Sequence, residues 1–218
     1  RPERDVKLKV PPTFAIRWLI PRLERFQTER PDIQVRLTSG MGEPKLGKEP
    51  FDLGVIYVRA GEPGRRGDVL AANRAVPVAA RRYLDGAPAL HAPADLARHQ
   101  LVSTDASGWE WRRWARAFDV DDLPLEDALQ FEVAEAAIQA ARSGQGIALV
   151  DRSFVARDLT AGELVAPLDV APLDLGHWLA AYARGVLEDP CVAAFRDWLL
   201  REAETDAIDA PPATPTLA

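Results

Sequence analysis

The strongest constraint on the fold is an apolar pattern that switches between two periods near the start of the chain. Val6, Leu8 and Val10 alternate with lysines, which is typical of a strand. Helical spacing follows in the next segment, at Ile16, Leu19, Ile20, Leu23 and Phe26. Alternation returns at positions 33, 35 and 37. A strand, a helix and a strand in this order predict a β-α-β unit with parallel strands and a right-handed crossover.

The same alternation continues to about residue 204. Further strands are predicted at 51–58, 75–80, 100–104, 129–133, 146–150, 163–168 and 177–183. Helices are predicted at 91–99, 109–118, 134–144, 152–162 and 190–204. Alternating strands and helices favour an α/β fold in which helices cover both faces of parallel sheets.

The start of the first helix is unusual because prolines surround it. Pro11 and Pro12 end the strand, and Thr13 is expected to cap the helix that follows. Pro21 lacks an N–H and should kink this helix or mark where its regular part begins. Parallel sheets bind ligands beyond the carboxyl ends of strands, so this turn is a candidate for facing a cleft. The alternative is that Thr13 only caps its own helix.

Charge and cysteine content exclude some functions. The 218 residues carry a net charge of −6, which makes them a poor duplex-DNA surface, because such surfaces are usually basic. A single cysteine, Cys191, allows no intrachain disulfide. No apolar run approaches the length of about 20 residues that spans a bilayer. The chain does not begin with methionine, and we expect a further segment upstream.

Motifs for catalysis and for cofactors are missing from the sequence. The histidines at 91, 99 and 177 lack metal-ligand spacing, and "GQG" at 144–146 follows a helix rather than a strand. We therefore expect no catalytic residue, no metal and no cofactor. Glu132 and His177 remain candidates for lining a pocket. The alternatives are that Glu132 pairs with an arginine and that His177 caps a strand end.

An ordered set of segments carries a family resemblance. "TFAIRWLIPRLERFQTERPDIQVRL" resembles the opening of the effector-binding domain of LysR-type transcriptional regulators, in the branch of the glycine-cleavage activator and the β-lactamase regulators. The resemblance continues in register through "FDLGVIYV", "VPVAARRYL", "PADLARHQLV", "WRRWARAF", "AIQAARSGQGIALV", "DLTAGELVAPLD" and "VAAFRDWL". It covers roughly residues 6 to 201.

This resemblance implies two Rossmann-like subdomains joined by crossing strands, as in type 2 periplasmic binding proteins. Subdomain I is expected at 1–75 plus 177–204 and subdomain II at 76–176, with a flexible tail at 205–218. A small effector is expected between the subdomains. The family's N-terminal winged helix-turn-helix is not in this chain.

Site residues also follow from the resemblance. The expected effector-binding residues are Pro12, Thr13, Phe14, Tyr57, Thr104, Glu132, Val133 and His177. A hydroxyl at a helix N-terminus suits an anionic group, and Glu132 suits an ammonium group, so an amino-acid- or peptide-like effector is expected. A dimer interface is expected between the first helix and the helix near 134–142, through Arg17, Glu24, Arg25, Ala134, Ala137 and Ala141. The alternative is that these alanines pack against their own sheet.

The function that this resemblance implies is that of a ligand sensor in a cytoplasmic bacterial transcription regulator. Such a domain would form a homodimer or tetramer, contact DNA only through the upstream domain, and bind no membrane. Two other functions remain open on this fold. One is a periplasmic solute receptor, and the other is an enzyme.

Overall fold

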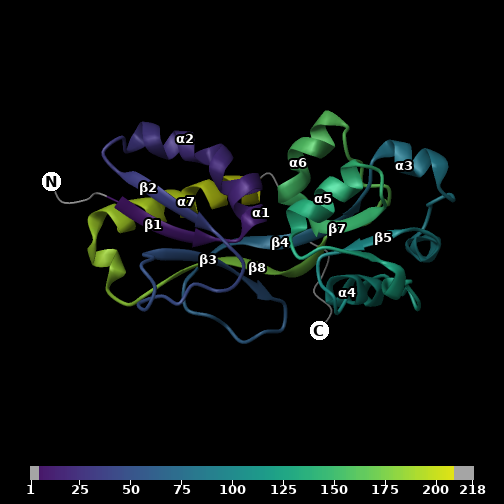
Figure 1. The fold of residues 1–218 in the computed structure, drawn as a ribbon, viewed down its shortest axis with the longest axis horizontal. Helices are drawn as coiled ribbons and strands as arrows, with labels where there is room; N and C mark the ends of the chain where they lie inside the picture. The colour runs from purple at the N-terminus through teal and green to yellow at the C-terminus, as the bar shows by residue number, and fades with distance from the viewer. Residues whose placement is uncertain (1–4, 209–218) are drawn as a thin grey trace. The chain divides into compact units, whose positions relative to one another are not determined.

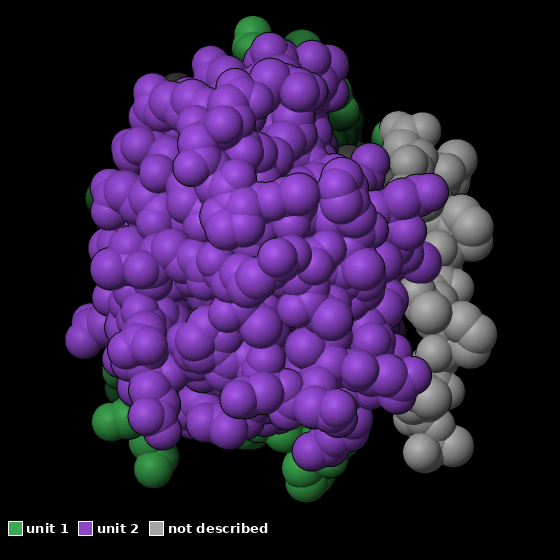
Figure 2. All heavy atoms as spheres, turned by 90° about the vertical axis from the view of Figure 1, so that its right-hand side faces the viewer, with its two compact units in different colours: residues 1–72, 176–211 green, residues 73–175, 212–218 purple. Residues whose placement is uncertain are grey.

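The computed structural model describes residues 5–208, and these fall into two compact units. Unit 1 comprises residues 5–72 and 176–208, and unit 2 comprises residues 73–175. Figure 2 colours the atoms of unit 1 green and those of unit 2 purple. Two long strands, β4 (Asp68–Val78) and β8 (Leu173–Tyr182), each begin in one unit and end in the other. These are crossing strands of the kind that the resemblance implies.

Unit 1 contains the predicted β-α-β unit (Figure 1). Strand β1 (Asp5–Val10) pairs in parallel with β2 (Gln34–Ser39) and with β3 (Leu53–Arg59). Strand β8 pairs with β3 in the antiparallel sense, so the sheet of this unit is mixed rather than wholly parallel. Val6, Leu8 and Val10 are buried, as their alternation with lysines predicts.

The first helix runs from residue 12 to residue 29 in three consecutive pieces. These are α1 (Pro12–Phe14), a π-helical turn η1 (Ala15–Leu19) and α2 (Ile20–Glu29). The N–H of Ile20 bonds to the carbonyl of Ala15, which is the wider π spacing. Pro21 has no N–H for the carbonyl of Arg17, so the regular ladder is interrupted here. A π-turn is one way in which a helix absorbs such an interruption.

The π-turn changes which face of the first helix is buried. Ile16 and Ile20 were expected on the buried stripe, but they are 48% and 50% exposed. The buried side chains are instead Phe14, Ala15, Trp18, Leu19 and Phe26. Regular helical spacing predicts Leu19 and Phe26 correctly and fails for Ile16 and Ile20, because the wider turn rotates one part of the helix relative to the other.

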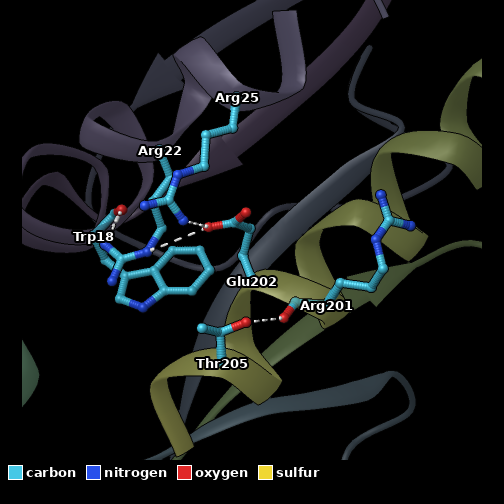
Figure 3. A network of polar contacts seen from close by, with 6 residues as sticks. All are labelled: Trp18, Arg22, Arg25, Arg201, Glu202 and Thr205. Atoms are coloured by element: carbon cyan, nitrogen blue, oxygen red, sulfur yellow. Dashed lines mark hydrogen bonds and ion pairs between the residues drawn. The ribbon is translucent and has the colours of Figure 1, made fainter. Parts of the chain in front are cut away.

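Helix α7 (Pro190–Ile208) packs against α2 in unit 1. The ring of Phe26 lies 4.9 Å from that of Phe195 and 5.2 Å from that of Trp198. Between the two helices, Glu202 accepts a hydrogen bond from Arg25 at 3.0 Å and lies 3.9 Å from Arg22 (Figure 3). The helix continues to residue 208, so the expected tail at 205–218 is helical over its first residues. The rest of that tail lies outside the described residues.

Hydrogen bonds among three polar side chains connect α7 to the start of β4. Arg196 donates to the carboxylate of Asp68 at 2.7 Å, and the hydroxyl of Tyr182 donates to the same carboxylate at 2.7 Å. The Arg196 guanidinium lowers the pKa of the Asp68 carboxyl, and burial raises the pKa of the Tyr182 hydroxyl. Short turn η4 (Val186–Glu188) connects β8 to α7.

Unit 2 contains the other strands of the eight-stranded sheet, together with its own helices. Strands β7 (Ile147–Asp151), β5 (Leu101–Ser103) and β6 (Leu129–Gln130) are parallel neighbours, and β4 joins β7 in the antiparallel sense. The remaining elements are α3 (Arg81–Gly86), η2 (Pro93–Arg98), α4 (Trp109–Ala117), η3 (Leu125–Asp127), α5 (Ala134–Arg142) and α6 (Arg152–Ala161). The strand predicted at 163–168 is only an isolated bridge between Val165 and Ala79.

The core of unit 2 follows the predicted helix faces closely. Trp111 and Trp114 of α4 are fully buried. Helix α5 ends where Gly144 adopts a left-handed φ of 74° and donates to the carbonyl of Ala141 at 3.0 Å, as predicted.

Within residues 5–208 no helix is both long and apolar enough to cross a membrane.

Candidate functional site

The first turn of the long helix of unit 1 follows directly after the carboxyl end of β1. Pro12 occupies the first helical position, and Pro11 rather than Thr13 is the N-cap. The prediction that Thr13 caps the helix is therefore wrong, because the helix already begins at Pro12. Thr13 and Phe14 are 5% and 1% exposed, so both side chains are held in place by packing.

A row of aromatic rings joins this turn to the neighbouring strands. The Phe14 ring lies 5.2 Å from the Trp178 ring, and the Trp178 ring lies 5.0 Å from the Tyr57 ring. Tyr57 of β3 and Trp178 of β8 are register partners, which places both rings on one face of the sheet. The Phe14 ring also lies 4.9 Å from that of Trp18. Unit 1 therefore brings Phe14 and Tyr57 together through Trp178.

His177 lies on the other face of the same sheet. Its register partner is Val58, which belongs to a buried cluster with Ile56, Leu179 and Ala181. Because successive side chains of a strand point to opposite faces, His177 does not share the face of Tyr57 and Trp178. The register thus separates His177 from Tyr57 and Trp178, and its expected role in the effector site stays a prediction.

In unit 2, the predicted residues gather where β5 and β6 end. These parallel strands are neighbours with Ser103 opposite Gln130, so Thr104 and Glu132 both follow their carboxyl ends. The hydroxyl of Thr104 donates to Glu110 of α4 at 2.7 Å. Glu132 is exposed and makes no ion pair with any of residues 5–208, which disfavours the alternative of an arginine partner. Val133, half-buried, is the N-cap of α5.

One residue that the predicted site omits is Trp178, which connects Phe14 to Tyr57. It immediately follows His177 in the late strand, so the choice between the two depends on which side chain faces the helix. Strand alternation alone does not decide that choice, since both faces of β8 are covered. The pairing of β8 with β3 is what separates them, and only the folded chain provides it.

The two parts of the expected dimer interface differ in exposure. Glu24 and Arg25 are exposed and Arg17 is half-buried, although Arg25 is engaged with Glu202. Ala137 and Ala141 are fully buried within the chain and Ala134 is half-buried. Ala137 and Ala141 cannot contact a second copy, so the alternative that these alanines pack within their own unit fits better.

No arrangement for metal binding is found within residues 5–208, where no group of three or more His, Cys, Asp or Glu side chains is suitably placed. The polar groups near these candidate residues are hydroxyls and two carboxylates, those of Glu110 and Glu132, and aromatic rings lie beside those of unit 1. Such a set can bind and orient a small molecule through hydrogen bonds and ring contacts.

Comparisons of the sequence with known proteins all match the same protein family. Residues 1–204 match the family described as the LysR substrate binding domain. The glycine cleavage system transcriptional activator of Escherichia coli K12 is 32% identical over 196 residues, which cover 89% of this chain and 64% of that protein. The transcriptional activator AmpR of Pseudomonas aeruginosa is also 32% identical, over 197 residues and the same shares. The chain thus spans less than two thirds of these curated relatives.

A solved structure agrees with this grouping. The effector domain of AmpR from P. aeruginosa superposes with a TM-score of 0.80 at 28% identity, covering 94% of this chain and 97% of that one. The AmpR effector binding domain of Citrobacter freundii, at 20% identity and a TM-score of 0.77 over 92% of this chain and 98% of that one, supports the fold. The predicted α/β fold and the predicted regulatory domain, rather than a solute receptor or an enzyme, are confirmed. The chain belongs to the LysR substrate-binding domain family.

Proposed function

We propose that this chain senses a small-molecule effector and passes its bound state to a DNA-binding domain upstream in a longer regulator. The observation that carries the proposal is the family match over residues 1–204. The relatives that match are transcriptional activators by name and are longer than this chain. The proposal assigns DNA contact to that upstream domain because this chain has a net charge of −6.

The proposed effector-binding residues are found in both units. In unit 1 these are Pro12, Thr13 and Phe14 in the first helical turn, with Tyr57 on the adjacent sheet face. Thr104, Glu132 and Val133 come from unit 2. The two units correspond to regulatory subdomains I and II. His177, on the face of β8 opposite Tyr57, completes the proposed set.

The chemistry of these residues supports an effector with an apolar body and an ammonium group. Tyr57 and Trp178 present ring surface, which favours contact with flat or apolar groups. The exposed carboxylate of Glu132 has no ion-pair partner among the described residues, so a cationic group would provide one. An amino acid with an apolar side chain, or a short peptide, satisfies both requirements.

Self-association is the second part of the proposal. Ile16 and Ile20 are one helical turn apart, large, apolar and half-exposed on the outer side of the first helix. Glu24 follows Ile20 by a further four residues and extends the same outer side of the helix. We propose that this ridge, with Arg17, Glu24 and Arg25 along it, contacts a second copy in a dimer or tetramer. Cytoplasmic location follows from the DNA-binding role of the longer protein.

The experiment that tests the regulatory role uses the natural longer protein that contains this chain. Its binding to its own upstream promoter DNA is measured by fluorescence anisotropy, with and without candidate amino acids and peptides. A change in DNA affinity with one of these compounds supports the proposal, and the compound must be recovered chemically unchanged. Conversion of the compound to a product would favour an enzyme instead.

A further inference from the structure

A pocket lies at the end of the unit 1 sheet that is opposite Pro12, Thr13 and Phe14. Its volume is about 590 Å³, and its lining includes Lys7, Lys48, Glu49, Phe51, Asp52 and Arg184. The pocket adjoins the amino-terminal halves of β1 and β3, whereas Pro12 and Thr13 follow the carboxyl end of β1. Strand β8 ends here too, because Tyr182 lies opposite Leu53.

The backbone of this pocket is well defined by hydrogen bonds between its two sides. The N–H of Lys7 donates to the carboxylate of Asp52 at 2.8 Å, and the N–H of Asp52 donates to the carbonyl of Lys7 at 2.9 Å. In the loop before β3, the N–H groups of Lys48 and Glu49 both donate to the carbonyl of Lys45 at 2.9 Å. The cationic side chains therefore start from fixed positions.

The carboxylates of the pocket are already engaged, but its cations are not. Glu49 accepts from the ammonium of Lys9 at 3.3 Å and from the N–H of Lys45 at 3.1 Å. Asp52 accepts from a backbone N–H. Three cationic side chains make no ion pair with any of residues 5–208, and these are Lys7, Lys48 and Arg184.

This excess of positive charge stands out because the whole chain carries a net charge of −6. Like charges in a concave surface repel one another, and they attract counter-ions more strongly than the same charges on a flat surface. Phe51 adds a half-buried ring to the pocket, and the Lys9 ammonium lies 5.6 Å from its centroid. Lys9 is thus committed to both Glu49 and Phe51, which leaves the other cations for a ligand.

We propose that this pocket binds a small dianion, a phosphate group or a dicarboxylate, independently of the effector site. Lys7, Lys48 and Arg184 all line the pocket, so the two charges of a dianion can be balanced by different cations, which a single carboxylate does not require. The guanidinium fork of Arg184 suits either oxygen-rich group. This proposal does not depend on the regulatory function, because the pocket lies wholly within unit 1 and shares no residue with the proposed effector site.

The test is a titration of the full chain with inorganic phosphate and, separately, with succinate, followed by heteronuclear NMR at constant ionic strength set with chloride. We expect saturable shifts in the amides of residues 47–52 and 183–186 with one or both dianions. Saturation by phosphate alone identifies a phosphate site, and saturation by both identifies a general dianion site. Absence of saturable shifts with either dianion would overturn the proposal.

Variants that remove one positive charge distinguish a specific dianion site from nonspecific electrostatic attraction to the whole chain. Lys48→Gln and Arg184→Gln should each weaken binding about fivefold, as expected for one surface charge near the ligand. Arg201→Gln is the matched control, because Arg201 lies in the same unit but pairs with Glu29 on α2 at 2.8 Å. Equal weakening by Arg201→Gln would show that only net charge matters and would also overturn the proposal.

Discussion

The guanidinium of Arg22 lies over the indole of Trp18, 4.7 Å from the ring centroid, and donates to the Trp18 carbonyl at 2.8 Å (Figure 3). This carbonyl belongs to the π-turn, where the regular hydrogen-bond ladder is interrupted. Arg22 thus satisfies a backbone group and covers a buried ring with one side chain. It also lies 3.9 Å from Glu202, so it connects the irregular turn to α7.

Arg22→Met should lower the free energy of unfolding by about 1–2 kcal/mol. The change keeps an apolar chain over Trp18 but removes the cation–π contact and the hydrogen bond to the carbonyl. Urea denaturation followed by tryptophan fluorescence measures the loss. Arg25→Met is the matched control and should cost less than about 0.5 kcal/mol, because Arg25 is 66% exposed in its pair with Glu202. Equal losses would show that Arg22 acts only as a surface charge.

Replacing either of the two buried tryptophans of α4 with phenylalanine removes nearly the same side-chain volume, so the two variants can be compared directly. The indole N–H of Trp111 donates to the carbonyl of Val102 at 2.9 Å, whereas that of Trp114 is buried without a partner among the described residues. Trp111→Phe should therefore destabilise the chain more than Trp114→Phe, by about 1 kcal/mol. Chemical denaturation of both variants checks this order. A larger loss for Trp114→Phe would mean that packing outweighs the hydrogen bond.

The stability of the chain should decrease as the pH falls below about 6.5, partly through His99. Burial lowers the pKa of His99, and Arg98 acts in the same direction while Asp95 opposes it. Since the folded state binds this proton more weakly than the unfolded state, the contribution is fully present above the ordinary histidine pKa and is lost below it.

His99→Gln should reduce the slope of stability against pH in this range. His99 Nδ1 lies 3.4 Å from the hydroxyl of Tyr83, and glutamine keeps a polar group there without titrating. Denaturation midpoints between neutral and mildly acidic pH provide the slopes. If the variant and the wild type have the same slope, His99 does not cause the decline.

Ile20→Glu should convert the proposed dimer to a monomer without unfolding the chain. A carboxylate on the half-exposed ridge formed with Ile16 would be left without water on association. Sedimentation equilibrium measures the change. Val69→Glu is the matched control, since Val69 is 60% exposed in the same unit but lies on β4, and it should leave association unchanged. A wild-type chain that stays monomeric at high concentration would contradict the proposed interface.

The sequence predicts the alternation of elements well, because buried strands and amphipathic helices repeat their own periods. Val6, Leu8 and Val10, the tryptophans of α4 and the end of α5 at Gly144 all lie where local patterns place them. The buried face of the first helix, in contrast, is not predicted correctly by the local pattern. Periodicity assumes a constant twist, and the π-turn before Pro21 breaks that assumption, so Ile16 and Ile20 are exposed.

The candidate site is less predictable than the fold because it depends on strand register and on packing between distant segments. Residue type alone predicts that Thr13 is a helix cap, yet Pro12 already begins the helix. His177 and Trp178 are adjacent in the sequence and differ only in the sheet face that each occupies. Pairing β8 with β3 decides between them, and no local pattern contains that information.

The proposed effector site is tested most directly by calorimetric titration of the effector into the wild-type chain and into Thr13→Val. The variant keeps the shape of a side chain that is 5% exposed and removes its hydroxyl. We expect one effector per chain and a loss of about 1–3 kcal/mol in the variant, since a polar group of the ligand loses its partner. Thr28→Val, in the same helix but exposed, should bind as the wild type does. Equal affinities for wild type and Thr13→Val would contradict the placement of the site at the first helical turn.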